Sequence, residues 1–209
     1  MTDIRRQDLR RPTVALTLGL ALGLLALALP TAAAAHIVKG EAIGFVSGFL
    51  HPISGLDHII AMVAVGLWGA QLGRPAIWLL PVTFPLVMAF GGFLGLIGVP
   101  LPGSEIAIAL SGVCLGAVVL TEFRPPLWVA AVLVGTFGLF HGYAHGAELP
   151  PGQNALLYSL GFIIATGLLH ATGIAIGVVH RWTWGRLALR AAGAAILSGG
   201  AFFLWTALA

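Results

Sequence analysis

Residues 51–62 read His51-Pro-Ile-Ser-Gly-Leu-Asp57-His58-Ile-Ile-Ala-Met62, which sets two imidazoles, a carboxylate and a thioether before a segment otherwise suited only to lipid. An ionisable side chain costs roughly 2.5–3.5 kcal/mol at the centre of a membrane on insertion scales, and such residues usually mark ion or proton pathways. Pro52 disfavours the helical conformation at His51. We therefore predict a short half-helix, a break at His51-Pro52 and a new helix from about residue 53. Broken helices are tolerated in membranes where the freed backbone lines a cavity.

The composition indicates an all-α, polytopic membrane protein. Hydrophobic residues make up 59% of the 209 residues and charged residues 8%, whereas soluble domains carry about 25% charged residues. A single cysteine, Cys114, excludes an internal disulfide and is interpreted as a small packing residue. The net charge is +3, and four of the ten basic residues lie within the first eleven positions, so the charge is not that of a nucleic-acid-binding protein.

The first 35 residues have the pattern of a signal peptide. Basic residues precede an apolar run over residues 14–29, and small residues suited to cleavage follow. We expect cleavage near Ala35, which would leave His36 at or near the new amino terminus and residues 36–209 as a single transmembrane domain. The alternative is an uncleaved first transmembrane helix.

Six transmembrane helices are expected after the signal peptide, preceded by the broken half-helix. Turn signals separate them, including Gly73-Arg74-Pro75 and the run from Leu149 to Gly152. The predicted spans are residues 56–72, 76–97, 104–120, 127–146, 154–179 and 188–208.

The distribution of arginines predicts the orientation of these spans. Arg74 follows the first span and Arg124 the third, and Arg181, Arg186 and Arg190 lie around the start of the sixth. Loops rich in basic residues stay in the cytoplasm, so both mature termini are expected in the periplasm of a bacterial inner membrane. A cleaved signal peptide predicts the same orientation. The motifs of the first and fourth spans then lie at similar depth on the outer side.

The second motif reads Phe140-His141-Gly-Tyr-Ala-His145-Gly-Ala-Glu148. On a helix, His141, His145 and Glu148 are spaced i, i+4 and i+7 and share one face. Imidazoles with a carboxylate suit Ni, Zn, Co or Cu better than Mg or Ca, and the negative end of a helix favours a cation. The alternative is a pair of helix-end histidines at the level of the lipid headgroups. We predict that the two motifs meet at one divalent-metal site.

Within the first motif, ligation can be shared or indirect. Asp57 and His58 point about 100° apart on a helix, so one can orient the other instead of both binding the ion. His51, at the end of the half-helix, can reach back to the same point.

Three further residues are secondary candidates for metal binding or relay. Met62 lies one turn beyond His58 and is either a ligand or a packing residue. His170 lies in the middle of the fifth span, with Thr166 one turn earlier, and is either a relay or lower ligand or a histidine bonded to a neighbouring helix. His36 would offer an amine and an imidazole if cleavage exposes it.

Both motifs resemble those of the HupE/UreJ family, whose patterns are His-Pro-x-x-Gly-x-Asp-His and Phe-His-Gly-x-Ala-His-Gly-x-Glu. No motif position of this chain departs from them, and the signal peptide and six spans extend the resemblance over essentially the whole chain. The resemblance implies a permease for Ni²⁺ or Co²⁺ that supplies the maturation of nickel-iron hydrogenase or urease. It implies a transported ion and no prosthetic group. The implied metal-handling residues are His51, Asp57, His58, His141, His145 and Glu148.

Other classes of function fit the sequence less well. The chain has no Walker A motif, so it does not hydrolyse ATP itself. An intramembrane metal-dependent hydrolase could use Glu148 as its base, but neither His-Glu-x-x-His nor Gly-x-Ser-x-Gly is present. A haem-binding electron carrier and a metal-binding membrane chaperone that does not transport are the remaining alternatives. We expect a transporter, not an enzyme, whose partners are the metal ion and the lipid bilayer.

Overall fold

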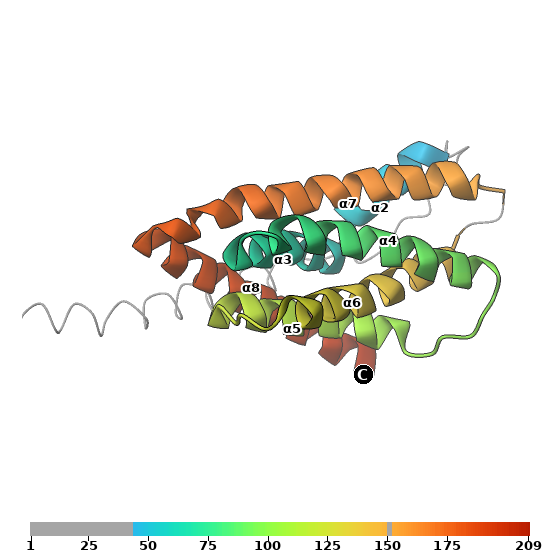
Figure 1. Ribbon diagram of the computed structural model, residues 1–209. Coiled ribbons are helices and arrows are strands. Elements are labelled where there is room, and N and C mark those ends of the chain that lie inside the picture. The colour runs from blue at the N-terminus through green and yellow to red at the C-terminus, as the bar shows by residue number, and fades with distance from the viewer. Residues whose placement is uncertain (1–43, 150–151) are drawn as a thin grey trace, which may run out of the picture.

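The computed structural model describes residues 44–149 and 152–209, and every regular element in that part of the chain is helical (Figure 1). The predictions for residues 1–35 and for His36 lie outside the described residues. The elements are α2 (Gly44–Ser54), α3 (Leu56–Leu72), α4 (Ala76–Leu96), α5 (Ser104–Thr121), α6 (Leu127–Ala147), α7 (Ala155–Gly177), the 3₁₀ helix η1 (Val178–Arg181) and α8 (Thr183–Leu208).

Five of these helices, α4 to α8, are long and apolar enough to cross a membrane. The pair α2 and α3 adds a sixth candidate span if the two are counted together, and they meet at an angle of 81°. The prediction of an all-α, multi-pass membrane protein is therefore confirmed.

The position of the break between α2 and α3 was predicted wrongly. Helix α2 continues through His51 and Pro52 and ends at Ser54, whose hydroxyl donates to the carbonyl of His51 at 2.7 Å. The chain turns at Gly55, which is extended (φ −101°, ψ 122°). Pro52 lies in the last turn of a short helix, where the loss of one N–H interrupts little of the hydrogen-bond ladder. Position 55 favours glycine, because a Cβ there would lie 2.7 Å from Oδ1 of Asp57.

The last span also begins earlier than predicted. Helix α8 starts at Thr183 instead of residue 188. Its first turns were missed because they carry Trp184 and Arg186 and so lack the apolar character of a membrane span. Long basic and aromatic side chains can extend toward the membrane surface, so a helix continues beyond its apolar part. The other predicted spans agree with α3 to α7 within two residues.

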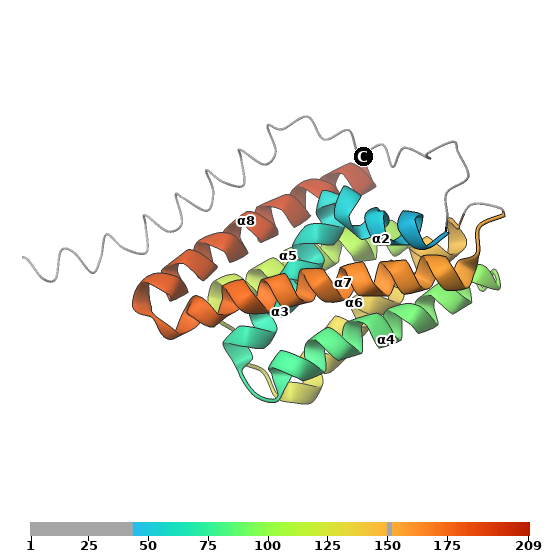
Figure 2. The ribbon, with the colours of Figure 1, turned by 90° about the horizontal axis from the view of Figure 1, so that it is seen from above.

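The helices pack side by side in one bundle (Figure 2), and glycines allow several of them to approach closely. A Cβ at Gly142 would collide with the backbone carbonyl of Met88, and one at Gly146 would collide with that of Gly92, so α6 lies directly on α4. In the same way, a Cβ at Gly161 would collide with the carbonyl of Phe45, which joins α2 to α7. Small residues of this kind let helix backbones approach in membranes, where no hydrophobic force drives helices together.

Charged residues differ between the two ends of the bundle. The arginines of the described residues lie at the end that holds the α3–α4, α5–α6 and α7–α8 junctions: Arg74, Arg124, Arg181, Arg186 and Arg190. At this end Arg186 pairs with Glu122 at 3.2 Å. The opposite end, with the α4–α5 and α6–α7 junctions, carries Glu105 and Glu148, and Asp57 lies further in, just after the α2–α3 bend. The bundle therefore has an acidic end and a basic end.

Candidate metal centre

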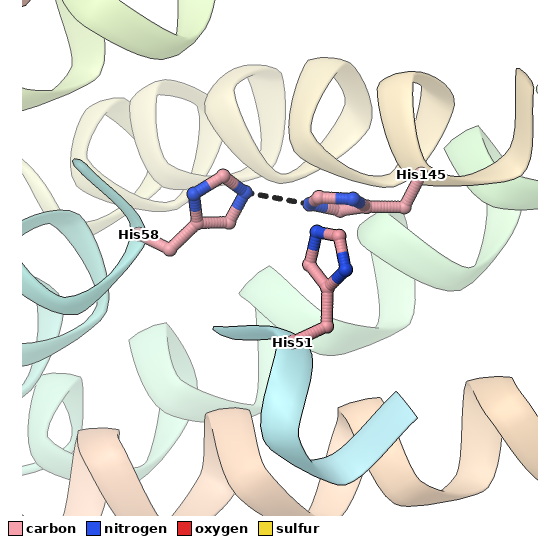
Figure 3. Close-up of side chains that lie close together, drawn as sticks. All are labelled: His51, His58 and His145. Carbon is pink, nitrogen blue, oxygen red and sulfur yellow. Dashed lines mark hydrogen bonds between the residues drawn. The ribbon is translucent and has the colours of Figure 1, made fainter. Parts of the chain in front are cut away.

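Three histidines from three helices converge near the acidic end of the bundle (Figure 3). His51 comes from the last turn of α2, His58 from the first turn of α3 and His145 from the last turn of α6. One ring nitrogen from each lies within 4.8 Å of the other two. The Nε2 atoms of His58 and His145 are 2.6 Å apart, which is the distance of a hydrogen bond. The structure thus brings the two motifs together, 87 residues apart in sequence.

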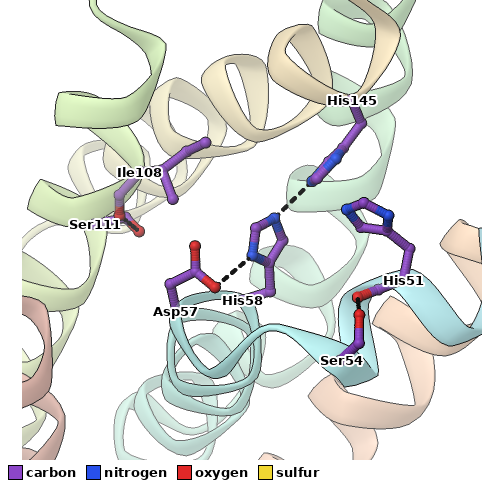
Figure 4. A network of polar contacts seen from close by, with 7 residues as sticks. All are labelled: His51, Ser54, Asp57, His58, Ile108, Ser111 and His145. Carbon is purple, nitrogen blue, oxygen red and sulfur yellow. Dashed lines mark hydrogen bonds and ion pairs between the residues drawn. The ribbon is translucent and has the colours of Figure 1, made fainter. Parts of the chain in front are cut away.

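The carboxylate of Asp57 fixes how His58 presents its ring (Figure 4). Oδ1 of Asp57 lies 2.8 Å from Nδ1 of His58, on the side of the ring away from His145. A carboxylate at this position holds the proton on Nδ1 and leaves the Nε2 lone pair free, as in the carboxylate–histidine–metal arrangements of many proteins. Nε2 of His145 then donates the hydrogen bond to Nε2 of His58, and an arriving metal ion would displace that proton. Asp57 therefore acts on His58 and points away from the three-nitrogen group.

His141 lies one helical turn deeper along α6 than His145. Its Nδ1 donates to the carbonyl of Phe137 at 2.9 Å, so its Nε2 carries the lone pair. This Nε2 is buried and has no hydrogen-bond partner. The centroid of the ring is 5.3 Å from that of His58. His141 thus offers a free nitrogen next to the three-histidine group, one helical turn closer to the basic end of the bundle.

Aromatic side chains that sequence reasoning missed enclose the histidines. The Phe162 ring packs 4.6 Å from that of His145, and Tyr158 lies 6.1 Å from His51. Phe84 of α4 packs 5.4 Å from His141. A cavity of about 320 Å³, lined mainly by apolar side chains, borders His145 between α4, α6 and α7. The one-turn spacing of Tyr158 and Phe162 on α7 could have indicated their shared face, but Phe84 carries no local signal.

The nitrogen spacing fits a late divalent metal ion after small side-chain movements. Imidazole nitrogens bind such ions at roughly 2.0–2.1 Å, so two of them on one ion lie roughly 2.9–3.4 Å apart. The separation of 2.6 Å between His58 and His145 is slightly too short, and the upper limit of 4.8 Å within the group is too long. Rotations within the normal range of side-chain torsions correct both. Three neutral nitrogens suit Ni²⁺, Co²⁺, Zn²⁺ or Cu²⁺ better than Mg²⁺ or Ca²⁺.

The remaining predicted residues lie outside this group. Glu148 follows the end of α6, its side chain is exposed, and it makes no ion pair or hydrogen bond with the described residues. Met62 is fully buried in the hydrophobic core. His170 is buried deeper in the bundle, where its ring packs 5.3 Å from that of Phe84. The metal-handling roles of all three remain predictions.

Fold and site together define a helical, multi-pass membrane protein with a buried group of three histidines near one end of its bundle. The model of the HupE / UreJ protein family matches residues 24–203, and the chain belongs to this family. It is 48% identical over 181 residues to Protein HupE of Rhizobium leguminosarum bv. viciae. The aligned residues cover 87% of this chain and 94% of that protein. No solved structure matches the chain.

Proposed function

We propose that this protein is a permease that carries Ni²⁺, or Co²⁺, from the periplasm to the cytoplasm and so supplies the maturation of nickel-iron hydrogenase or urease. The observation that carries the proposal is the convergence of His51, His58 and His145 from three helices on one buried point. Family membership supports the same function, because the two motifs that define the resemblance supply all three histidines.

The separation of charge supports the direction of transport. The basic loops mark the cytoplasmic side of a membrane protein, so the histidine group would face the periplasm, with both mature termini on that side. The orientation rests on six spans, with α2 and α3 counted as one, and on a signal peptide cleaved before residue 36. Two carboxylates at the outer end, from Glu105 and Glu148, would raise the local concentration of cations there.

The residues of the two motifs have distinct roles in this proposal. His51, His58 and His145 replace water around the incoming ion, and Asp57 keeps His58 in the tautomer that binds. His141, with its free Nε2, takes the next contact on the inward side. Glu148 lies exposed at the mouth and attracts the ion before it binds. A site with three exchangeable nitrogen ligands binds weakly enough to release its ion, as transport requires.

Uptake of radiolabelled nickel tests the proposal. In cells that lack other nickel importers, we expect His58→Ala and His145→Ala to abolish accumulation while membrane insertion remains normal. His180→Ala is the matched control, because His180 lies in η1 at the basic end, where its Nδ1 contacts only the carbonyl of Gly177. Normal uptake by either site variant would refute the site. Competition with Co²⁺ and Zn²⁺ in the same assay would establish which ion is preferred.

A flux assay in proteoliposomes separates transport from the alternatives. Purified protein should move Ni²⁺ across the vesicle membrane without any other protein component. A membrane chaperone would bind Ni²⁺ but produce no flux, and an intramembrane hydrolase would move no metal at all. Absence of flux would exclude the permease, and retained Ni²⁺ binding without flux would favour the chaperone.

A further inference from the structure

One face of α7 carries an unusual series of side chains at one-turn intervals: Tyr158, Phe162, Thr166 and His170. The first two enclose the three-histidine group. At a rise of 1.5 Å per residue, His170 lies roughly 12 Å further along the helix than Phe162, toward the basic end. The same face therefore leads from the histidine group into the middle of the bundle.

Thr166 and His170 are buried there without hydrogen-bond partners. Their exposed fractions are 0% and 1%, and Oγ1 of Thr166 and both ring nitrogens of His170 are unpaired. An unpaired buried polar group costs about 1–3 kcal/mol. A threonine in a helix can donate to the backbone carbonyl four residues earlier. Thr172 of the same helix does so, to the carbonyl of Leu168 at 2.8 Å. The Thr166 hydroxyl does not make the equivalent bond, so it remains available for another partner.

Helix α4 presents a third polar atom to the same point. Pro85 has no N–H, so the carbonyl of Pro81, four residues earlier, has no partner in the helical ladder. This carbonyl lies within reach of the His170 ring. An imidazole and a backbone carbonyl, both uncharged, thus lie close together in the interior, and the Thr166 hydroxyl is one turn earlier on the same face of α7.

The ring of Phe84 contacts both this position and the outer histidines. Its centroid is 5.4 Å from that of His141 and 5.3 Å from that of His170. His141 is the deepest histidine of α6, and its Nε2 is unpaired as well. Two buried imidazoles with free nitrogens therefore flank one phenyl ring.

We propose that His170, Thr166 and the carbonyl of Pro81 form a second, inner binding station for the divalent cation, separated from the outer histidines by Phe84. The station rests on the proposed transport function. One nitrogen and two neutral oxygens bind a late divalent metal more weakly than three imidazoles do. An ion that leaves His141 gains new ligands at the station before it is released toward the basic end, and rotation of the Phe84 ring controls the step.

Binding and flux of Ni²⁺ alone test the station. We expect His170→Ala and Thr166→Val to reduce flux in proteoliposomes at least tenfold and to leave the affinity of the outer site unchanged in equilibrium titrations. Two controls match the changes in chemistry: His180→Ala at the basic end, and Thr172→Val, whose hydroxyl already bonds to Leu168. If the wild type transports Ni²⁺ and both station variants transport it equally well, the station is overturned and the permease proposal stands. Absence of flux in the wild type overturns the permease itself.

A cysteine at the station provides a direct readout that an unfolded or merely slower variant would not give. In a Cys114→Ala background, His170→Cys should bind Co²⁺ with a thiolate-to-cobalt charge-transfer band in the near ultraviolet. Thr172→Cys in the same background should give none, because residue 172 lies on the exposed face of α7. Absence of the band from the His170→Cys protein, with its outer site still titrating, overturns the station.

Discussion

Replacement of Asp57 tests whether this carboxylate acts through His58 or binds the ion itself. Its Oδ1 lies 2.8 Å from Nδ1 of His58, and its side chain is 32% exposed. Hydrogen bonds to a charged group contribute about 1.5–3 kcal/mol and neutral ones about 0.5–1.5 kcal/mol. Asp57→Asn keeps an acceptor and loses the charge, a difference of about 1–1.5 kcal/mol or roughly tenfold in affinity. Partial exposure places the effect at the lower end of this range.

Removal of the acceptor altogether should have a larger effect. Asp57→Ala leaves Nδ1 of His58 without a partner and frees the ring to rotate, and loss of such an orienting group typically costs 10–100-fold in metal affinity. Gly55→Ala should weaken binding by a similar route, because its Cβ would lie 2.7 Å from Oδ1 of Asp57 and 3.1 Å from Nδ1 of His58. That variant keeps every histidine and carboxylate of the motif.

Calorimetric titration of Ni²⁺ into the purified protein in detergent measures these affinities. Glu122→Gln is the control, because it removes a carboxylate at the opposite end that pairs only with Arg186 and should leave affinity unchanged. If Asp57→Asn and Asp57→Ala bind like the wild type, the carboxylate does not orient His58. A loss far above 100-fold, with one oxygen fewer around nickel in X-ray absorption spectra, would show that Asp57 is itself a ligand.

Three further results are expected. Gly142→Ala should lower the free energy of unfolding by about 1–3 kcal/mol, because its Cβ collides with the carbonyl of Met88. Gly167→Ala, whose Cβ meets nothing within 4 Å, should be neutral or stabilise α7 by up to about 1 kcal/mol; fluorescence-monitored unfolding in detergent compares the two. Trp68→Phe should cost about 1 kcal/mol in the same assay, through loss of the 2.9 Å bond to the carbonyl of Phe123, without changing nickel affinity. Ni²⁺ at 100 times its dissociation constant should stabilise the wild type by about 2.7 kcal/mol, and a His145→Ala protein that is stabilised equally would contradict the site.

The sequence predicted the helices well because each one is an apolar run between turn signals. The prediction failed where a contact between residues close in sequence depends on how their side chains are placed in space. A proline is the usual helix breaker and predicts a break at Pro52, yet the turn occurs at Gly55, where Asp57 leaves no space for a Cβ. The start of α8 was missed because hydropathy reports the lipid-facing length of a helix and not its full length.

The sequence predicted that the two motifs meet and that Asp57 can orient His58, but not the detailed neighbours of each histidine. Spacing on a helix placed His141 and His145 on one face, and the structure assigns them different neighbours, Phe137 and His58. The shared face was also expected to include Glu148, which lies just past the last residue of α6. Phe84 could not be identified, because its position beside His141 depends on how α4 packs against α6 and α7.

The three imidazoles stand on helix groups that glycine contacts hold as separate units. His145 belongs to α6, which is locked to α4, whereas His51 belongs to α2, which is locked to α7. His58 follows the 81° bend that joins α2 to α3. A small slide of one unit along the other would therefore lengthen the gap between His145 and the remaining pair without disturbing either unit internally. Binding of one ion by all three imidazoles would therefore be thermodynamically linked to the relative position of the two helix groups.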